Sequence, residues 1–223
     1  MTRPAAPTPR PRRKTAALTL AVAGAVLLAS TATATATAAP AAPGRAAAGS
    51  GPAAQCRGLG VDPAARVRYR SDIVIDAPLS TVWKLQTDVE RWPSWQPPVL
   101  TSERLDPGRL RTGSRFRWTT PAPGTTLDIT STVRALEPRS CVLWTGPATG
   151  DGLRIDEGVH LWTFTEVDGH VHVHTEETWA GAQIESDAPT ATAALGASLE
   201  AWLHALKTTA ETRPTAPSGH SAI

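Results

Sequence analysis

The stretch HLWTFTEVDGHVHVHTEETW, residues 160–179, has two segments of alternating residues joined by Asp168-Gly169. Asp-Gly is typical of the central pair of a type I′ turn, which connects two antiparallel strands. Because residues two apart on a strand share a face, the turn predicts three cross-strand pairs on one side of a hairpin. These pairs are Phe164 with Val173, Trp162 with Thr175, and His160 with Glu177. The stretch therefore predicts an antiparallel sheet with one apolar face.

His160 and Glu177 are predicted to meet on this apolar face, and they are the candidate catalytic residues. A buried carboxylate beside an imidazole is stable mainly as a hydrogen-bonded pair, and such a pair can hold or transfer a proton. It can also anchor one polar end of an apolar ligand. The alternative interpretation is a structural pair that fixes the strand register.

Tryptophan dominates the aromatic residues, since the chain has eight beside one tyrosine and two phenylalanines. Alternation places several on the inward face of the strands, and helical spacing places Trp202 on the apolar stripe of the last helix. If that helix lies across the sheet, the indoles form either a packed core or the wall of a pocket. The predicted ligand contacts are Trp92, Trp95, Phe116, Trp118, Trp144, Trp162, Trp179, Leu199 and Trp202. Trp92 and Trp95 could either cover the mouth of the cavity or lie in the core, and the sequence does not decide between these two positions.

Periodicity predicts the other elements. A first strand at 67–75 precedes two short helical pieces around 82–85 and 90–96. Six further strands, bounded by Pro, Gly or Asp, are expected at 99–105, 114–120, 126–136, 140–145, 153–166 and 170–180. Apolar residues at helical spacing, with Asp187 as the cap, predict a long amphipathic helix at 188–211.

Several short motifs support a resemblance to a known superfamily. They are Ile75-Asp76-Ala77-Pro78 before Val82-Trp83, Asp88 with Arg91-Trp92-Pro93-Ser94-Trp95, Phe116-Arg117-Trp118, Glu137-Pro138 before Trp144-Thr145-Gly146, His160-Leu161-Trp162, and Glu176-Glu177 before Gly181. Over residues 68–211 the chain resembles the START, birch-pollen-allergen and polyketide cyclase (SRPBCC) superfamily. The resemblance implies an α+β helix-grip fold, in which a curved antiparallel seven-stranded sheet wraps around a long C-terminal helix, with two short helices after the first strand.

The resemblance implies two classes of function. In one, the protein is a non-catalytic binder or carrier of a small hydrophobic molecule, lipid or polyketide-like, held between sheet and helix. In the other, it is a polyketide cyclase/dehydrase-like enzyme in which His160 and Glu177 transfer a proton. Cyclases of the superfamily often have an inward arginine, whereas Arg115 and Arg117 alternate with the inward positions of their strand. That departure weakens the cyclase interpretation. No cofactor is expected in either case.

The N-terminal residues have the features of an export signal. A basic segment without acids precedes an apolar run at 15–28, and Ala36-Thr37-Ala38 offers a cleavage site. The run is too short and too rich in Ala and Thr for a membrane span of ~20 residues, so no stable span is expected after cleavage. Arg12-Arg13 leaves a twin-arginine route open beside general secretion. We predict a secreted or extracytoplasmic protein with a signal peptide at 1–38, an Ala/Pro/Gly-rich flexible linker at 39–65, one domain at 66–212 and a disordered tail at 213–223.

Export changes how charge and cysteines are interpreted. Removal of 1–38 leaves 17 of the 22 basic residues against 20 acidic ones, a net charge of about −3. No basic stripe remains, so nucleic-acid binding is not expected. The expected partner is a small hydrophobic molecule, and the protein is expected to be a monomer or a weak dimer. Cys56 and Cys141 are the only cysteines, and in an oxidising compartment they predict a disulfide, with two unpaired thiols as the alternative.

The histidines of the hairpin suggest a metal site as a rival interpretation. His170, His172 and His174 share one face of their strand, and two histidines at such spacing can bind zinc. Metal binding needs three or four converging ligands, however, and these side chains run outward along an exposed face. We therefore predict a solvated polar face and no metal.

Overall fold

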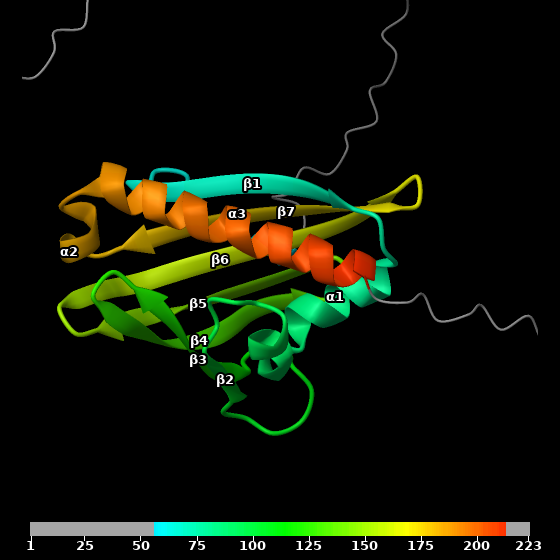
Figure 1. Ribbon diagram of the computed structural model, residues 1–223, viewed down its shortest axis with the longest axis horizontal. Helices are drawn as coiled ribbons and strands as arrows, with labels where there is room; N and C mark the ends of the chain where they lie inside the picture. Colours follow the sequence, from blue (N-terminus) through cyan, green and yellow to red (C-terminus); the bar gives the residue numbers. More distant parts are fainter. Residues whose placement is uncertain (1–55, 213–223) are drawn as a thin grey trace, which may run out of the picture. The chain divides into compact units, whose positions relative to one another are not determined.

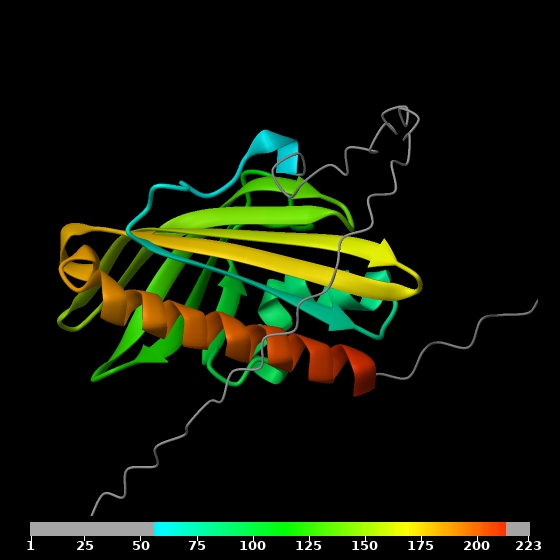
Figure 2. The same cartoon turned by 90° about the horizontal axis from the view of Figure 1, so that it is seen from above.

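The computed structural model describes residues 56–212, which form an antiparallel sheet with a long helix across one face (Figures 1 and 2). The strand order is β1-β7-β6-β5-β4-β3-β2. The strands are β1 (Val67–Ile75), β2 (Thr101–Arg104), β3 (Arg115–Ala122), β4 (Thr125–Glu137), β5 (Cys141–Gly150), β6 (Leu153–Val167) and β7 (His170–Ala180). The helices are η2 (Cys56–Gly58), α1 (Leu79–Thr87), η3 (Val89–Ser94), α2 (Ala182–Glu185) and α3 (Ala188–Thr212). The predicted seven strands, two short helices after the first strand and long final helix are all present.

The β6–β7 hairpin has the predicted register. His160 pairs with Glu177, Trp162 with Thr175 and Phe164 with Val173. Asp168 and Gly169 have φ values of 52° and 80°, which are the positive angles that a type I′ turn requires at both central positions. The turn chemistry in the sequence therefore sets which side chains meet across the centre of the sheet.

Helix α3 is held close to the edge strand β1. The site of contact is Gly196, where an added Cβ would lie 2.8 Å from the ring of Tyr69. Only a residue without a side chain allows this approach. The Tyr69 hydroxyl then donates a hydrogen bond to Glu200, at 2.9 Å, which fixes the helix along the strand. Helix α3 packs mainly against β1, and the other strands of the sheet curve away from it (Figure 2).

Strand β5 extends to Gly150, well past the predicted end at 145. The sequence signal that suggested an end is Gly146-Pro147, and the structure places a register shift between Gly146 and Ala148 at this point. Proline lacks a donor, and a β-bulge accommodates it without ending the strand. An added Cβ at Gly146 would lie 2.0 Å from the Thr130 carbonyl oxygen, so the bulge also requires glycine there.

The face of the sheet opposite α3 carries a second, smaller apolar cluster. Cys56 and Cys141 form a disulfide with a Cα–Cα distance of 5.5 Å, as predicted. Both cysteines are fully buried, beside Leu143 and Leu161, and Val61 packs onto the same cluster. The segment before β1 is therefore tied to the sheet rather than only leading into it.

The predicted signal peptide and tail, and most of the predicted linker, lie outside the described residues. Among residues 56–212, the structure has no helix with the length and apolar character needed to cross a membrane.

Candidate functional site

A cavity of about 670 Å³ lies between the sheet and the N-terminal half of α3. Its floor comes from β3 to β7, its roof from α3, and its ends from the β3–β4 and β5–β6 turns and α2. Asp151, Gly152, Gln183 and Asp187 line it and are exposed, so they mark its open end. The amide of Gln183 donates to the Gly152 carbonyl at 2.7 Å, which joins α2 to the β5–β6 turn there.

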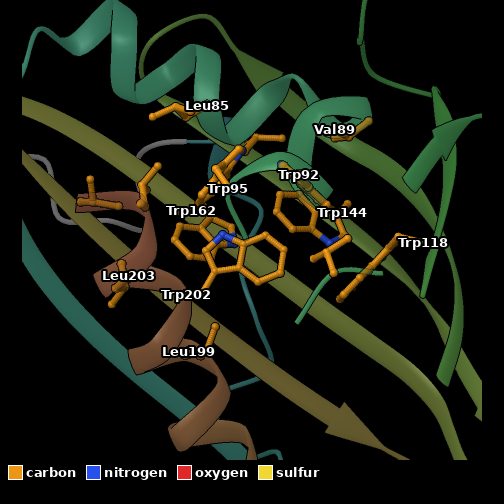
Figure 3. Close-up of a cluster of buried hydrophobic side chains, with 14 of the residues drawn as sticks. Leu85, Val89, Trp92, Trp95, Trp118, Trp144, Trp162, Leu199, Trp202 and Leu203 are labelled. Atoms are coloured by element: carbon orange, nitrogen blue, oxygen red, sulfur yellow. The ribbon is translucent and has the colours of Figure 1, made fainter. Parts of the chain in front are cut away.

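Most of the predicted ligand contacts line this cavity. They are Trp118, Trp144, Trp162, Trp179, Leu199 and Trp202. Figure 3 shows Trp202 reaching from α3 into the group of strand tryptophans. Its ring packs edge-on against Trp118, with ring centroids 5.8 Å apart, and lies 6.1 Å from Trp162. The indoles therefore form both a packed cluster and one end of the cavity wall.

Trp92, Trp95 and Phe116 do not line the cavity, although the sequence suggested that they contact the ligand. Trp92 is completely buried behind Trp202, with ring centroids 5.0 Å apart in an edge-to-face contact, and its indole N–H donates to the Gln86 carbonyl. Phe116 packs edge-on against Trp92. These side chains belong to the core that supports the wall, and Figure 3 shows Trp92 and Trp95 in one cluster with Trp202. Trp92 and Trp95 therefore lie in the core, which is one of the two positions that the sequence allowed for them.

The rings of Trp144, Trp162 and His160 stand nearly parallel on neighbouring strands. Trp144 is stacked with His160 at a centroid distance of 5.3 Å and with Trp162 at 6.5 Å. Parallel rings of this kind direct their edges away from the sheet. Aromatic edges carry partial positive charge and attract the negative face of another aromatic system. Trp144 and Trp162 are only 2% and 1% exposed, however, so the more accessible indoles of the cavity wall are those of Trp118, Trp179 and Trp202.

The opposite wall is made of small side chains, which the sequence analysis did not identify. Ala194, Ala197 and Ala201 are solvent-accessible on α3 and line the cavity, together with Ser198. In sequence such positions resemble the outer face of an amphipathic helix. Their small size keeps the space beneath the helix open. Their exposed surface does not distinguish them from ordinary surface residues, because the cavity is open to solvent.

The predicted polar pair is formed. His160 Nδ1 lies 2.7 Å from Glu177 Oε2, and the two residues are 8% and 5% exposed. The other carboxylate oxygen accepts the indole N–H of Trp179 at 2.6 Å. With Nδ1 donating to Glu177, Nε2 is the atom of the pair left to meet a ligand, as an acceptor when the ring is neutral and as a donor when it is protonated.

Gly158 gives His160 its access to the cavity. An added Cβ at this position would lie 3.1 Å from His160 Nε2 and 3.7 Å from Trp179 Cδ1. Gly158 also lines the cavity, beside the imidazole. The absence of a side chain therefore leaves Nε2 uncovered.

A buried amide holds the central tryptophan. Gln86 is fully buried, and its side-chain oxygen accepts the indole N–H of Trp202 at 3.0 Å. Since a buried N–H without an acceptor is costly, this bond favours one orientation of Trp202. No signal in the sequence distinguished Gln86 from an exposed glutamine of a short helix.

The other charged candidates face outward. His174 Nδ1 lies 2.8 Å from an oxygen of Asp72, and His170 Nδ1 lies 3.6 Å from Asp76, both on the neighbouring strand β1 or just beyond it. Within residues 56–212, no group of three or more His, Cys, Asp or Glu side chains is arranged to bind a metal. Arg115 and Arg117 are exposed and pair with acids of the outer face, as their alternation suggested.

A sequence-family model described as polyketide cyclase/dehydrase and lipid transport matches residues 66–211. The chain belongs to this family. The predicted membership of the SRPBCC superfamily is thereby confirmed.

Solved structures with low sequence identity share the fold. The Zhui aromatase/cyclase from Streptomyces sp. R1128 is 20% identical, with a TM-score of 0.54 over 68% of this chain and 98% of its own. A START superfamily protein from Mycobacterium smegmatis is 15% identical, with a TM-score of 0.54 over 65% and 97%. A hypothetical protein from Helicobacter pylori is 16% identical, with a TM-score of 0.56 over 67% and 91%. These similarities confirm the helix-grip fold. A comparison with curated proteins found no match to the chain.

Proposed function

We propose that the protein binds a small hydrophobic molecule in the cavity between the sheet and α3, as a non-catalytic binder or carrier. The observation that carries the proposal is the cavity of about 670 Å³, which has indoles on the sheet side and alanines on the helix side. A space of this size and apolar character is typical of ligand sites. The indoles of Trp118, Trp179 and Trp202 in its wall favour an aromatic ligand, because aromatic rings attract one another in offset-stacked or edge-to-face contacts.

His160 and Glu177 serve in this proposal as the polar anchor. Nε2 of His160 faces the ligand, while Glu177 and Trp179 hold the imidazole in place. A hydroxyl or carbonyl group of the ligand is the partner that fits, because the ring nitrogen can accept or donate.

The second candidate is a cyclase/dehydrase-like enzyme that uses the same pair. The observation that favours it is again the uncovered Nε2 beside Gly158, since a general base must reach the proton that it removes. The absence of arginine and lysine from the described residues lining the cavity favours the carrier.

We propose further that the protein functions outside the cytoplasm. The disulfide between Cys56 and Cys141 supports this, because such bonds persist in oxidising compartments. N-terminal sequencing of the mature protein tests the predicted cleavage after Ala38; an N-terminus that retains residues 1–38 would contradict it.

The cavity proposal is tested by filling it. Ala194 lines the cavity, whereas Ala193, the preceding residue, does not, although both are exposed on α3. We expect Ala194→Phe to reduce the affinity for a neutral aromatic probe, pyrenemethanol, by at least about tenfold, because the ring occupies ligand space. The matched control Ala193→Phe should bind like the wild type. Equal binding by all three proteins would contradict the proposed site.

A further inference from the structure

The charged residues that line the cavity are acidic. Among residues 56–212, the lining includes Glu177, Asp151 and Asp187 but neither lysine nor arginine. His160 is the one residue there that can become positive. The pair of His160 and Glu177 has a net charge of zero when the imidazole is protonated and −1 when the imidazole is neutral. In neither state does the pair cancel the negative charge of Asp151 or Asp187.

The acids stand at two depths. Glu177 is 5% exposed and lies deeper in the cavity, beside His160 and Trp179, whereas Asp151 and Asp187 are exposed at the open end. Asp187 Oδ1 also accepts the backbone N–H of Thr190 at 3.2 Å, which caps α3. A ligand in the cavity therefore has carboxylates near both of its ends.

Basic groups close to the open end are already paired with other acids. Arg154 forms an ion pair with Asp156, and Arg66 lies 4.0 Å from Glu185. Neither arginine lines the cavity. The two aspartates therefore give this opening a negative potential over about a Debye length, ~10 Å at moderate salt.

A second observation points to a ligand rather than to a solvated acidic rim. Nε2 of His160 belongs to a residue that is 8% exposed, lines the cavity, and forms no hydrogen bond through this atom within the described part of the chain. The cavity thus has a ring nitrogen available for a hydrogen bond at its inner end and negative charge at its opening.

From this arrangement we propose that the cavity excludes anionic ligands and binds a flat apolar molecule with a protonated amine more tightly than the corresponding carboxylate. The amine lies at the open end beside Asp151 and Asp187, and the aromatic part lies against the indoles of the cavity wall. The inference rests on the proposed function, because it assigns a charge preference to the same site.

Three probes with one ring system test the preference. Pyrenemethylamine, pyrenemethanol and pyrenecarboxylate share the apolar part and differ in charge. We expect the amine to bind at least about tenfold more tightly than the carboxylate at low ionic strength, with the neutral alcohol between them and the difference smaller at high salt. Isothermal titration calorimetry measures all three affinities.

Variants locate the cause. The double variant Asp151→Asn, Asp187→Asn should bring the amine and the carboxylate to within about threefold of each other, while asparagine preserves the cap on α3. Asp168→Asn is the control for a distant charge: it removes one negative charge from the β6–β7 turn, at the opposite end of β6, and should leave the preference unchanged.

The outcomes separate the two proposals. If the alcohol binds but the amine and the carboxylate bind equally, the charge preference is wrong and the cavity proposal stands. A tighter carboxylate, or a preference that survives the double variant, also overturns the inference. If none of the three probes binds, the proposed function and the inference fail together.

Discussion

Nδ1 of His160 lies 2.7 Å from Oε2 of Glu177, across the central hairpin of the sheet and inside an otherwise apolar wall. Trp179 binds the second carboxylate oxygen, so Glu177 has a partner on each side. A buried carboxylate held in this way fixes the ring orientation and leaves Nε2 available. The pair therefore has a structural role and a position suited to ligand contact at the same time.

Glu177→Gln tests the first of these roles. Loss of the charge-assisted hydrogen bond in a buried site should lower the free energy of unfolding by about 1–3 kcal/mol, measured by urea denaturation. Glu176→Gln is the control, because its side chain pairs with Arg68 on the outer face of the same strand. This pair is only partly buried, with the side chains of Arg68 and Glu176 32% and 13% exposed, so its loss should cost less than the loss of the buried pair. Equal effects of the two variants would show that the buried pair has no special importance.

Gly158→Ala tests the access of Nε2 to the cavity. The new Cβ, 3.1 Å from Nε2, should cover this atom and weaken binding of pyrenemethanol by about fivefold or more, because the anchoring hydrogen bond is lost. Calorimetric titration measures the change. Gly60→Ala, whose Cβ would meet nothing within 4 Å, is the control. Unchanged affinity for the alcohol in Gly158→Ala would exclude Nε2 as the anchor.

Cys56→Ser with Cys141→Ser tests the disulfide. The bond closes a sequence separation of 85 residues, so its loss should reduce the free energy of unfolding by about 2–5 kcal/mol. Urea denaturation of the wild type with and without reductant should show the same difference. If reductant has no effect on the wild type while thiol titration shows full reduction, the bond contributes nothing to stability.

Glu211 predicts a specific dependence of stability on pH. A hydrogen bond from Lys207, at 2.6 Å, and one from the backbone N–H of Asp76, at 2.8 Å, lower the pKa of its carboxyl below its ordinary value of 4.5. Because the folded-state pKa is the lower one, the stabilisation is present above pH 4.5 and is lost as the pH falls through the folded-state pKa. Glu211→Gln should therefore be less stable than the wild type near neutral pH.

The difference between these two proteins should disappear in acid. Urea denaturation at a series of pH values measures it. A difference that stayed constant to acid pH would mean that glutamine fails for a reason other than charge.

Local chemistry explains what the sequence could predict. Asp168-Gly169 favours a type I′ turn, and this turn sets the strand register that brings His160 to Glu177. Helical spacing likewise placed Leu199 and Trp202 on the inner side of α3. These features depend on residues close in sequence or on a single pairing, so periodicity was sufficient.

Features that depend on how elements pack together could not be predicted in this way. Pro147 suggested a strand end because the bulge that accommodates proline is defined by the pairing of β5 with the neighbouring strand β6. The sequence cannot distinguish Ala194 and Ala197 from surface positions of the helix, because small residues occur both beside an open cavity and on a surface exposed to solvent. Trp92 seemed able to reach the ligand because nothing in its own segment places η3 behind Trp202.

Native mass spectrometry of the protein purified from its natural source tests the central claim, that the cavity binds a small hydrophobic molecule. We predict an additional small mass on the wild type that organic extraction removes, retained by Ala193→Phe and missing from Ala194→Phe. The bare polypeptide mass for all three proteins, together with no binding of pyrenemethanol to any of them, would contradict the claim.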